Sequence, residues 1–475
     1  MANRPLWTVQ ELLAATGGTL HEKVRGVMNG VSIDSRAVNP GDIFVAIKGD
    51  VMDGHDFVVS ALNAGAGVAL VSRPTAAMHE AGAVLQVADD PLRGLENMGR
   101  AARAWSNGQI IAVTGSVGKT STKEMLRVAL SASGSTHASA ASFNNHWGVP
   151  LTLSRMPRNA AYGVFEIGMN HAGEITPLVK MVRPHIAIIT IVAASHLGNF
   201  TSLDHIAQAK AEIFSGLEKG GTAILNRDSS YFEILATAAK ASGAKTIIGF
   251  GRHQQADVRL EQVALHSTCC CITANVMGEV VTYKLGVPGE HMAINSLAVL
   301  AAVKASGADL ARAMLALADA APAKGRGVQE RLSVPGGELL LIDESYNANP
   351  VSMSAALALL AQAQTGKNGR RIAVLGDMLE LGPFGPQLHA ELTKAVDDYG
   401  IDFIYTSGPL MQNLWDALPP AKQGANASTS TELSDQLLAQ LRGGDAVMIK
   451  GSLGSKMGLV VEALRKKFAA AKKDI

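Results

Sequence analysis

The chain has 475 residues, a length that corresponds to about three domains of ordinary size. Apolar residues make up 47% of it and aromatic residues 4%, and the formal net charge is +1. This composition is typical of an α/β protein, and the near-neutral charge gives no reason to expect nucleic acid or a membrane surface as a partner.

The cysteine content and the hydropathy of the chain narrow the possible class of protein further. Cys269, Cys270 and Cys271 are the only cysteines, and successive residues of a strand point to opposite faces, so we expect unpaired thiols buried in a sheet. The first residues lack the apolar core of a signal peptide, and no apolar run approaches the ~18 residues that a membrane span needs. We therefore expect a cytoplasmic protein without membrane insertion.

The first 90 residues contain short elements separated by turns. Residues 31–36 and 43–47 read as strands on either side of a Pro40-Gly41 turn. A helix is expected at 57–65 and a strand at 68–71, and the Asp90-Pro91 step indicates a boundary because proline restricts the residue before it.

The most informative segment lies at residues 110–121. An apolar, β-branched run at 110–113 enters a glycine-bounded turn of the form T-G-x-x-G-K-T-S, and a helical pattern follows. Backbone N–H groups of such a turn bind phosphate, its lysine adds positive charge, and its hydroxyl can complete the shell of a Mg²⁺ ion. A purely structural turn is the alternative. The sequence predicts a nucleoside triphosphate site at Thr114, Gly115, Ser116, Val117, Gly118, Lys119, Thr120 and Ser121.

Strands then alternate with helices, which implies a parallel sheet whose ligands bind at the carboxyl ends of the strands. Glu166 ends a buried strand at 163–167 and is a candidate Mg²⁺ ligand, with a simple ion pair as the alternative. His196 follows the next strand at 186–191, and a metal-binding and a structural role are equally favoured. Lys210 lies in an amphipathic helix beside its apolar stripe, and this pattern favours a solvated surface lysine.

The pattern changes after a strand at 221–225. Residues 258–284 read as a small antiparallel patch and 293–306 as a helix, and 321–327 as a linker. The α/β pattern then restarts with strands at 338–343, 372–376, 403–406 and 446–450. Polar loops follow three of these strands, at 343–350, 376–382 and 450–456. They should lie at one edge of the sheet and form a second wall facing the phosphate loop.

Taken in order along nearly the whole chain, these motifs resemble those of the Mur ligases, the ATP-dependent amide-forming enzymes of peptidoglycan precursor synthesis. The segments Ser345-Tyr346-Asn347-Ala348-Asn349-Pro350 and Gly376-Asp377-Met378 are the most specific, and they resemble the branch that performs the last addition. The Asp-Asn-Pro-Arg signature of the preceding, diaminopimelate-adding branch is absent. Further matching motifs are Asp34-Ser35-Arg36, Asp53-Gly54-His55, Asn144–Pro150, Gly325-Arg326 and Lys450-Gly451-Ser452.

The resemblance implies an α/β fold with three domains. These are a small N-terminal α/β UDP-binding domain (1–90), a central P-loop ATPase-like parallel sheet (91–322) and a C-terminal Rossmann-like α/β domain (323–475). The implied reaction is ATP-dependent addition of D-Ala-D-Ala to UDP-N-acetylmuramoyl-tripeptide through an acyl phosphate, carried out by a monomer in the bacterial cytoplasm. Whether the third peptide residue is meso-diaminopimelate or L-lysine stays open.

Roles for individual residues also follow from the resemblance. Lys119 and Thr120 would hold the phosphates and one Mg²⁺, with Glu166 as a further ligand of that ion. His196 would bind a second Mg²⁺. Lys210 would be carbamylated, which overturns the interpretation of Lys210 as a surface residue. The remaining nucleotide-side residues would be Asn145, Asn295, Arg326, Asp343, Tyr346, Asn347 and Asn349. The UDP-precursor side would comprise Asp34, Ser35, Arg36 and Lys48.

The sequence departs from the family pattern at two places. Met292 follows His291 where the family often has asparagine, so the adenine contact rests on Asn295, and the 450–456 loop differs from the common Lys-Gly-Ser-Arg/Asn-Ser. Two alternatives remain: a folylpolyglutamate-type ligase, which lacks the N-terminal module that 34–56 indicates, and a non-catalytic nucleotide switch.

Overall fold

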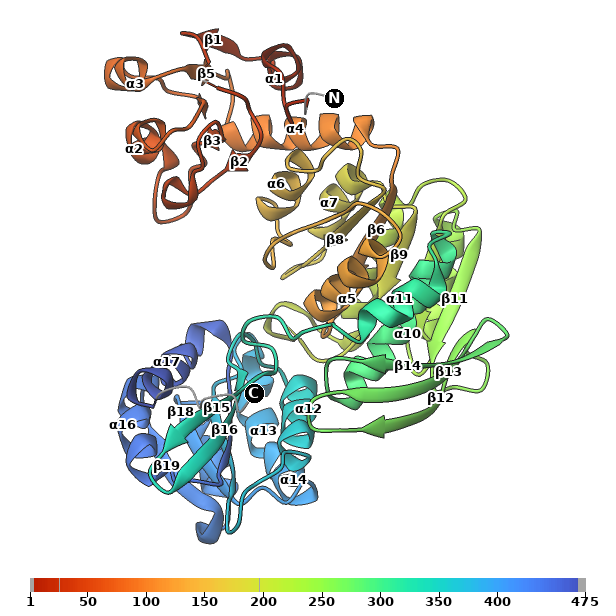
Figure 1. Ribbon diagram of the computed structural model, residues 1–475, viewed down its shortest axis with the longest axis vertical. Helices are drawn as coiled ribbons and strands as arrows, with labels where there is room; N and C mark the ends of the chain where they lie inside the picture. Colours follow the sequence, from red (N-terminus) through yellow and green to blue (C-terminus); the bar gives the residue numbers. More distant parts are fainter. Residues whose placement is uncertain (1–3, 25, 196, 469–475) are drawn as a thin grey trace.

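The computed structural model describes residues 4–24, 26–195 and 197–468, and three β-sheets follow one another along the chain (Figure 1). Each sheet has its own helices and its own apolar clusters. The three-domain α/β architecture predicted from the sequence is therefore confirmed. None of the helices in the described residues is long and apolar enough to cross a bilayer.

The N-terminal sheet has five strands in the order β1-β5-β4-β3-β2, all parallel except β1. Its apolar side chains pack against helices on both faces. The strands are β1 (Thr19–His21), β2 (Val31–Ser32), β3 (Ile43–Val45), β4 (Val68–Val71) and β5 (Val84–Gln86), and the helices are α1 (Val9–Thr16), α2 (Val58–Asn63) and α3 (Ala76–Ala81).

The strand expected at 31–36 is shorter in the structure. It ends at Ser32, and a 3₁₀ turn follows at Ser35–Ala37. The cause is local, because the Asp34 carboxylate accepts a hydrogen bond from the Arg36 backbone N–H at 3.0 Å and so caps the turn.

Helix α4 (Pro91–Trp105) joins the N-terminal sheet to the central one (Figure 1). It begins where Asp90 caps it and Pro91 occupies its first turn, as the Asp-Pro step predicted. One face packs on the N-terminal core and another on α6 (Gly148–Ser154). The Trp7 indole also donates to the Ser154 carbonyl at 2.8 Å. The first two domains are thus fastened together through buried contacts.

The central sheet has nine strands in the order β14-β13-β12-β11-β10-β9-β6-β8-β7. It is parallel from β7 to β12, and β12 to β14 form the antiparallel patch expected at 258–284. The strands are β6 (Gln109–Thr114), β7 (Thr136–Ala138), β8 (Tyr162–Glu166), β9 (Ile186–Ile189), β10 (Thr222–Asn226), β11 (Thr246–Gly251), β12 (Val258–Leu265), β13 (Cys270–Val276) and β14 (Glu279–Leu285).

Helices cover both faces of the central sheet. Helix α10 (Glu290–Ala305) is apolar around most of its circumference and is buried against α5 (Lys119–Ser131) and the sheet. The opposite face is covered by α6, α7 (Ile175–Val182), α8 (Leu203–Ala211) and α9 (Phe232–Ala241), and α11 (Leu310–Leu317) packs beside α5. Of the three cysteines only Cys270 is buried, because Cys271 points to the exposed face of β13.

The C-terminal sheet has six strands in the order β15-β16-β20-β17-β18-β19, parallel except for the β15–β16 hairpin. The strands are β15 (Val328–Val334), β16 (Gly337–Glu344), β17 (Arg371–Gly376), β18 (Phe403–Ser407), β19 (Gln423–Ala427) and β20 (Ala446–Lys450). The helices are α12 (Pro350–Ala361), α13 (Gly385–Ala390), α14 (Leu392–Asp398), α15 (Gln412–Ala417), α16 (Ser430–Gln440) and α17 (Gly458–Lys467).

A backbone contact joins the central and C-terminal domains. The Gly198 N–H donates to the Glu380 carbonyl at 2.9 Å. Gly198 and Gly382 approach so closely that a Cβ on Gly198 would lie 3.1 Å from the Gly382 nitrogen. This interdomain contact, formed by 198 and 380–382, brings the carboxyl ends of the two sheets toward each other.

Candidate functional site

The site is built around the turn between β6 and α5. Gly115 and Gly118 have φ of 150° and 86°, which favours glycine. Side chains of larger residues would also collide, because a Cβ on Gly118 would lie 2.5 Å from the Asn295 amide nitrogen. The Thr190 hydroxyl donates to the Val117 carbonyl at 2.6 Å and holds the turn from the neighbouring strand end. The turn therefore presents the open N-terminus of α5 as a rigid anion-binding surface.

Thr120 and Glu166 meet directly behind this turn. Glu166 ends β8, where it pairs in register with Val113 of β6, and it is 1% exposed. Its carboxylate accepts hydrogen bonds from the Thr120 hydroxyl at 2.9 Å and from the Asn144 amide at 2.7 Å. Adjacent parallel strands thus bring together the two oxygen-bearing side chains that the sequence separated by 46 residues.

Lys119 lies at the mouth of the turn and is half-buried. Its ammonium donates to the Gly115 carbonyl at 2.7 Å. Burial and the Arg326 guanidinium lower the pKa of Lys119, while the Glu166 carboxylate partly opposes this change. A group in this position can move its hydrogen bonds from a carbonyl to an arriving phosphate.

Lys210 is buried, contrary to the surface position that the amphipathic pattern favoured. It lies in the last turn of α8 and is 2% exposed. Burial, together with the nearby Lys119 charge, lowers its pKa well below that of a solvated lysine. The buried face of the helix is therefore wider than its apolar residues indicate, because it includes Lys210. His196 lies outside the described residues.

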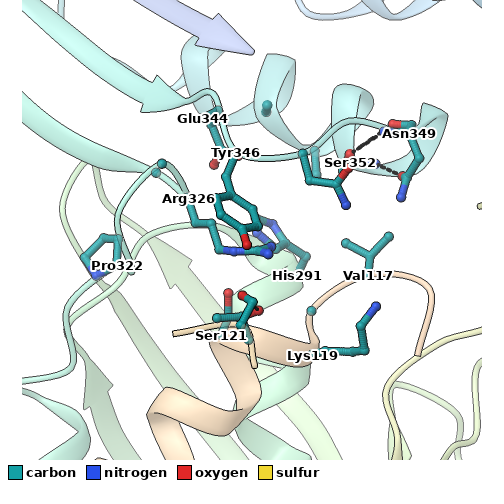
Figure 2. A pocket seen from close by; sticks show the side chains of 18 of the residues that line it. Val117, Lys119, Ser121, His291, Pro322, Arg326, Glu344, Tyr346, Asn349 and Ser352 are labelled. Atoms are coloured by element: carbon teal, nitrogen blue, oxygen red, sulfur yellow. Dashed lines mark hydrogen bonds between the residues drawn. The ribbon is translucent and has the colours of Figure 1, made fainter. Parts of the chain in front are cut away.

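The C-terminal domain supplies the opposite wall of the cavity (Figure 2). Tyr346 projects from the loop after β16, and the Arg326 guanidinium lies over its ring at 4.5 Å from the ring centre. Lys450, at the end of β20, donates to the Glu344 carboxylate at 3.2 Å and to the Asn347 carbonyl at 2.9 Å. Burial lowers the pKa of Lys450.

The three polar loops contribute unequally to this wall. Residues of the 343–350 loop and Lys450 line the cavity beside the phosphate turn, as expected. Asn349 also caps α12, since its side chain accepts from the Ser352 N–H at 2.9 Å (Figure 2). The 376–382 loop instead lines a neighbouring hollow with Ser195 and Ser452.

Three of the predicted nucleotide-side residues make contacts within the protein. Asn295 packs behind Gly118, and Asn145 accepts from the Gly148 N–H at 2.9 Å at the start of α6. Asp343 is 2% exposed and binds the Ser345 hydroxyl at 2.6 Å and Arg465 at 3.5 Å. Asn145 and Asn295 are not among the residues that line the cavity between the phosphate turn and Tyr346 in the described parts of the chain, whereas Asp343 lines an adjoining cavity with Thr120, Arg326 and Tyr346.

The four predicted UDP-precursor residues lie in the N-terminal domain. Arg36 binds both oxygens of Asp34, at 2.9 and 2.8 Å, and Arg36 lowers the pKa of Asp34 to about 2. Ser35 starts the 3₁₀ turn beside them, and Lys48 is exposed. The loop after Lys48 reaches the central domain, because a Cβ on Gly49 would lie 3.2 Å from the Trp147 ring.

Comparisons with known proteins agree with this arrangement. Family models match residues 27–103 (Mur ligase family, catalytic domain), 113–303 (Mur ligase middle domain) and 330–453 (Mur ligase, glutamate ligase domain). The chain is 31% identical over 457 residues to the UDP-N-acetylmuramoyl-tripeptide–D-alanyl-D-alanine ligase of Rickettsia prowazekii, covering 96% of this chain and 99% of that protein. The chain belongs to the Mur ligase family. The Escherichia coli protein of the same name is 33% identical over 439 residues, covering 92% of this Mur ligase and 94% of the relative.

A solved Mur ligase structure has the same overall arrangement. MurF from Acinetobacter baumannii superposes with a TM-score of 0.83 at 32% identity, covering 97% of this chain and 99% of that chain. The likeness therefore extends over all three domains.

Sequence reasoning missed several residues that surround the cavity of this Mur ligase. Asn144, not Asn145, binds Glu166, and the Ser142 hydroxyl lies 3.1 Å from that of Thr120. His291 lines the cavity at the start of α10, and burial lowers its pKa. The Asn144-Asn145 pair carried the signal for this site, but only the backbone geometry decides which amide turns inward.

Proposed function

We propose that this Mur ligase uses ATP to join D-Ala-D-Ala to UDP-N-acetylmuramoyl-tripeptide, releasing ADP and phosphate. The observation that carries the proposal is the similarity to relatives whose names state this activity. The similarity covers more than nine tenths of this chain and of each relative. The phosphate turn and the facing cation set supply a chemical reason for it. A folylpolyglutamate-type ligase is disfavoured because the N-terminal family model matches residues 27–103.

The chemistry requires two anions to meet. A carboxylate oxygen of the tripeptide attacks the γ-phosphorus, the bond to the β-phosphate oxygen breaks, and an acyl phosphate forms. The amine of the dipeptide then attacks the acyl carbon, loses a proton, and phosphate leaves with the former carboxylate oxygen. Lys119, Arg326 and Lys450 are the cations that would neutralise this charge, and they lie on both walls of one cavity.

The residues present fit a Mg²⁺ ion. The Thr120 hydroxyl and Glu166 carboxylate form a buried, all-oxygen donor pair, and Mg²⁺ is usually bound by one or two carboxylates together with substrate phosphates. When bound, the ion would neutralise charge on the phosphates. Beyond this pair, the described residues hold no cluster of three or more histidine, cysteine or acidic side chains suited to a metal.

We infer that Lys210 is the carbamylated lysine of the family, acting at a second Mg²⁺ site with His196. Addition of CO₂ to an amine requires its neutral form and releases one proton. The lowered pKa of Lys210 supplies that neutral form, and the carbamate would become an anion near Lys119. The support is therefore chemical: burial makes Lys210 reactive, and its neighbour favours the charge of the product.

We assign substrates to domains accordingly. Residues 1–90, with Asp34, Ser35, Arg36 and Lys48, would bind the UDP-precursor, and residues 91–322 the triphosphate. Residues 323–475 would contribute Tyr346, Asn347 and Asn349 on the nucleotide and dipeptide side. Asn295 would lie near the adenine, and Asp343 would serve the ribose or the hinge. We further propose that the enzyme works as a monomer in the bacterial cytoplasm.

The proposal is tested by measuring ATP turnover while each substrate is omitted in turn. A ligase should release phosphate only when both the UDP-muramoyl-tripeptide and D-Ala-D-Ala are present, and pentapeptide should form in equal amount. ATP hydrolysis at the same rate without them would instead support a nucleotide switch and would overturn the proposal.

A further inference from the structure

Lys123 is the only lysine of α5 that is completely buried, and it lies one turn after Lys119 on the same helix. Its side chain has 0% exposure. A buried ammonium is costly unless its three donors are satisfied. The Lys123 ammonium donates to the Ser139 carbonyl at 2.7 Å and to the Ala141 carbonyl at 3.4 Å. It also forms an ion pair with the Glu124 carboxylate at 2.7 Å.

Apart from Glu124, which follows Lys123 in α5, the partners of Lys123 belong to the loop between β7 and α6. Three residues beyond Ser139 the chain reaches Ser142, whose hydroxyl lies 3.1 Å from that of Thr120. Asn144 follows two residues later; its amide donates to Glu166 at 2.7 Å and its carbonyl accepts from the Gly168 N–H at 2.8 Å. The loop is thus held at one end by Lys123 and at the other by the end of β8.

We propose that Lys123 is a positioning residue for the Thr120–Glu166 pair, an inference that rests on the proposed function. Its ammonium fixes the backbone of residues 139–141, so that Ser142 and Asn144 orient the hydroxyl and carboxylate that would hold Mg²⁺. The partners are mainly backbone carbonyls, so the contact sets the path of the loop rather than the choice of its side chains.

Lys123 contributes to stability, because methionine at this position would leave the Ser139 carbonyl and the Glu124 carboxylate without this partner. Stability alone does not account for the direction of the contact. What an apolar side chain lacks is the directed hydrogen bonds to the carbonyls of Ser139 and Ala141, which lie five and three residues before Asn144. Residues that orient metal ligands typically change metal affinity or activity by about 10- to 100-fold when they are replaced.

The test measures binding of a non-hydrolysable ATP analogue with and without Mg²⁺, alongside kcat. In Lys123→Met, we expect the gain in affinity from Mg²⁺ and kcat each to fall about tenfold, while Mg²⁺-free nucleotide binding and UDP-precursor binding stay within about twofold. Arg127→Met is the matched control, because Arg127 pairs with the same Glu124 on the same helix at 2.8 Å but is exposed. Arg127→Met should leave the Mg²⁺-dependent gain, kcat, Mg²⁺-free nucleotide binding and UDP-precursor binding unchanged.

A double-mutant cycle decides whether Lys123 acts through the loop. The Ser142→Ala/Asn144→Ala variant should itself lose the Mg²⁺-dependent gain, and adding Lys123→Met to it should change the gain by less than about twofold. The proposal would be overturned if Lys123→Met reduced the Mg²⁺-dependent gain in nucleotide affinity equally in the wild type and in Ser142→Ala/Asn144→Ala. It would also be overturned if Ser142→Ala/Asn144→Ala kept the full Mg²⁺-dependent gain. Loss of precursor binding in Lys123→Met would show a general structural role and also overturn it. Absence of ligase activity in the wild type would instead count against the proposed function.

Discussion

Replacing Glu166 by glutamine removes one negative charge from the proposed Mg²⁺ site while keeping the shape of the side chain. The carboxylate now accepts from Thr120 at 2.9 Å and from Asn144 at 2.7 Å. A glutamine could accept from the Asn144 amide through its oxygen and donate to the Thr120 hydroxyl through its nitrogen, and that hydroxyl could turn toward Ser142. We therefore expect Glu166→Gln to remain folded.

The expected loss concerns metal-dependent binding. A hydrogen bond or contact to a charged group contributes about 1.5–3 kcal/mol. At about 1.4 kcal/mol per factor of ten, its removal weakens Mg²⁺-dependent nucleotide binding by roughly 10- to 150-fold. Folding stability should change by less, about 2 kcal/mol at most, because both hydrogen bonds persist in neutral form and a buried charge is removed.

Isothermal titration with a non-hydrolysable ATP analogue, at several Mg²⁺ concentrations, measures this loss. Glu174→Gln is the control, since Glu174 is an exposed acid of the same domain that pairs with His171. Mg²⁺-free binding should be at least as tight in Glu166→Gln as in the wild type, because a negative charge near the phosphates has gone. Wild-type Mg²⁺ dependence in Glu166→Gln would refute the assignment of this carboxylate.

Three further changes test other parts of the site. Lys119→Ala should abolish product while UDP-precursor binding is retained in a titration; loss of both would contradict the division of substrates between domains. Lys210→Ala should be inactive and partly rescued by short carboxylates added to the assay, whereas a fully active variant would remove Lys210 from the site. Gly198→Val should push the 380–382 backbone away, because a Cβ there would lie 3.1 Å from the Gly382 nitrogen. Small-angle X-ray scattering should then report a more open molecule with lower kcat, and an unchanged profile would disprove this role of the interdomain contact.

The features of the site that depend on a local sequence pattern could be predicted from the sequence. The phosphate turn was predictable because glycine spacing, a lysine and a hydroxyl all act within eight residues, and Glu166 because a carboxylate at a buried strand end needs a partner. Strand positions such as 446–450 followed from continuous apolar runs. The family resemblance added the order of the motifs and hence the three domains.

Features that depend on tertiary packing were not predictable in the same way. Lys210 looked like a surface residue because the helical pattern alone does not show that other parts of the fold bury that position. The contact between Asn144 and Glu166 was not predicted, because it depends on which side of the loop the Asn144 amide faces. The edge strands β15 and β19 were missed because their alternation is weak and partly exposed.

Transfer of an oxygen atom tests the central claim most directly. The UDP-muramoyl-tripeptide is prepared with ¹⁸O in its reacting carboxylate and incubated with ATP and D-Ala-D-Ala, and the released phosphate is analysed by mass spectrometry. If the carboxylate attacks the γ-phosphate and phosphate later leaves with its oxygen, each pentapeptide formed should yield one phosphate carrying ¹⁸O. Pentapeptide accompanied by unlabelled phosphate, or formed without ATP consumption, would contradict the account.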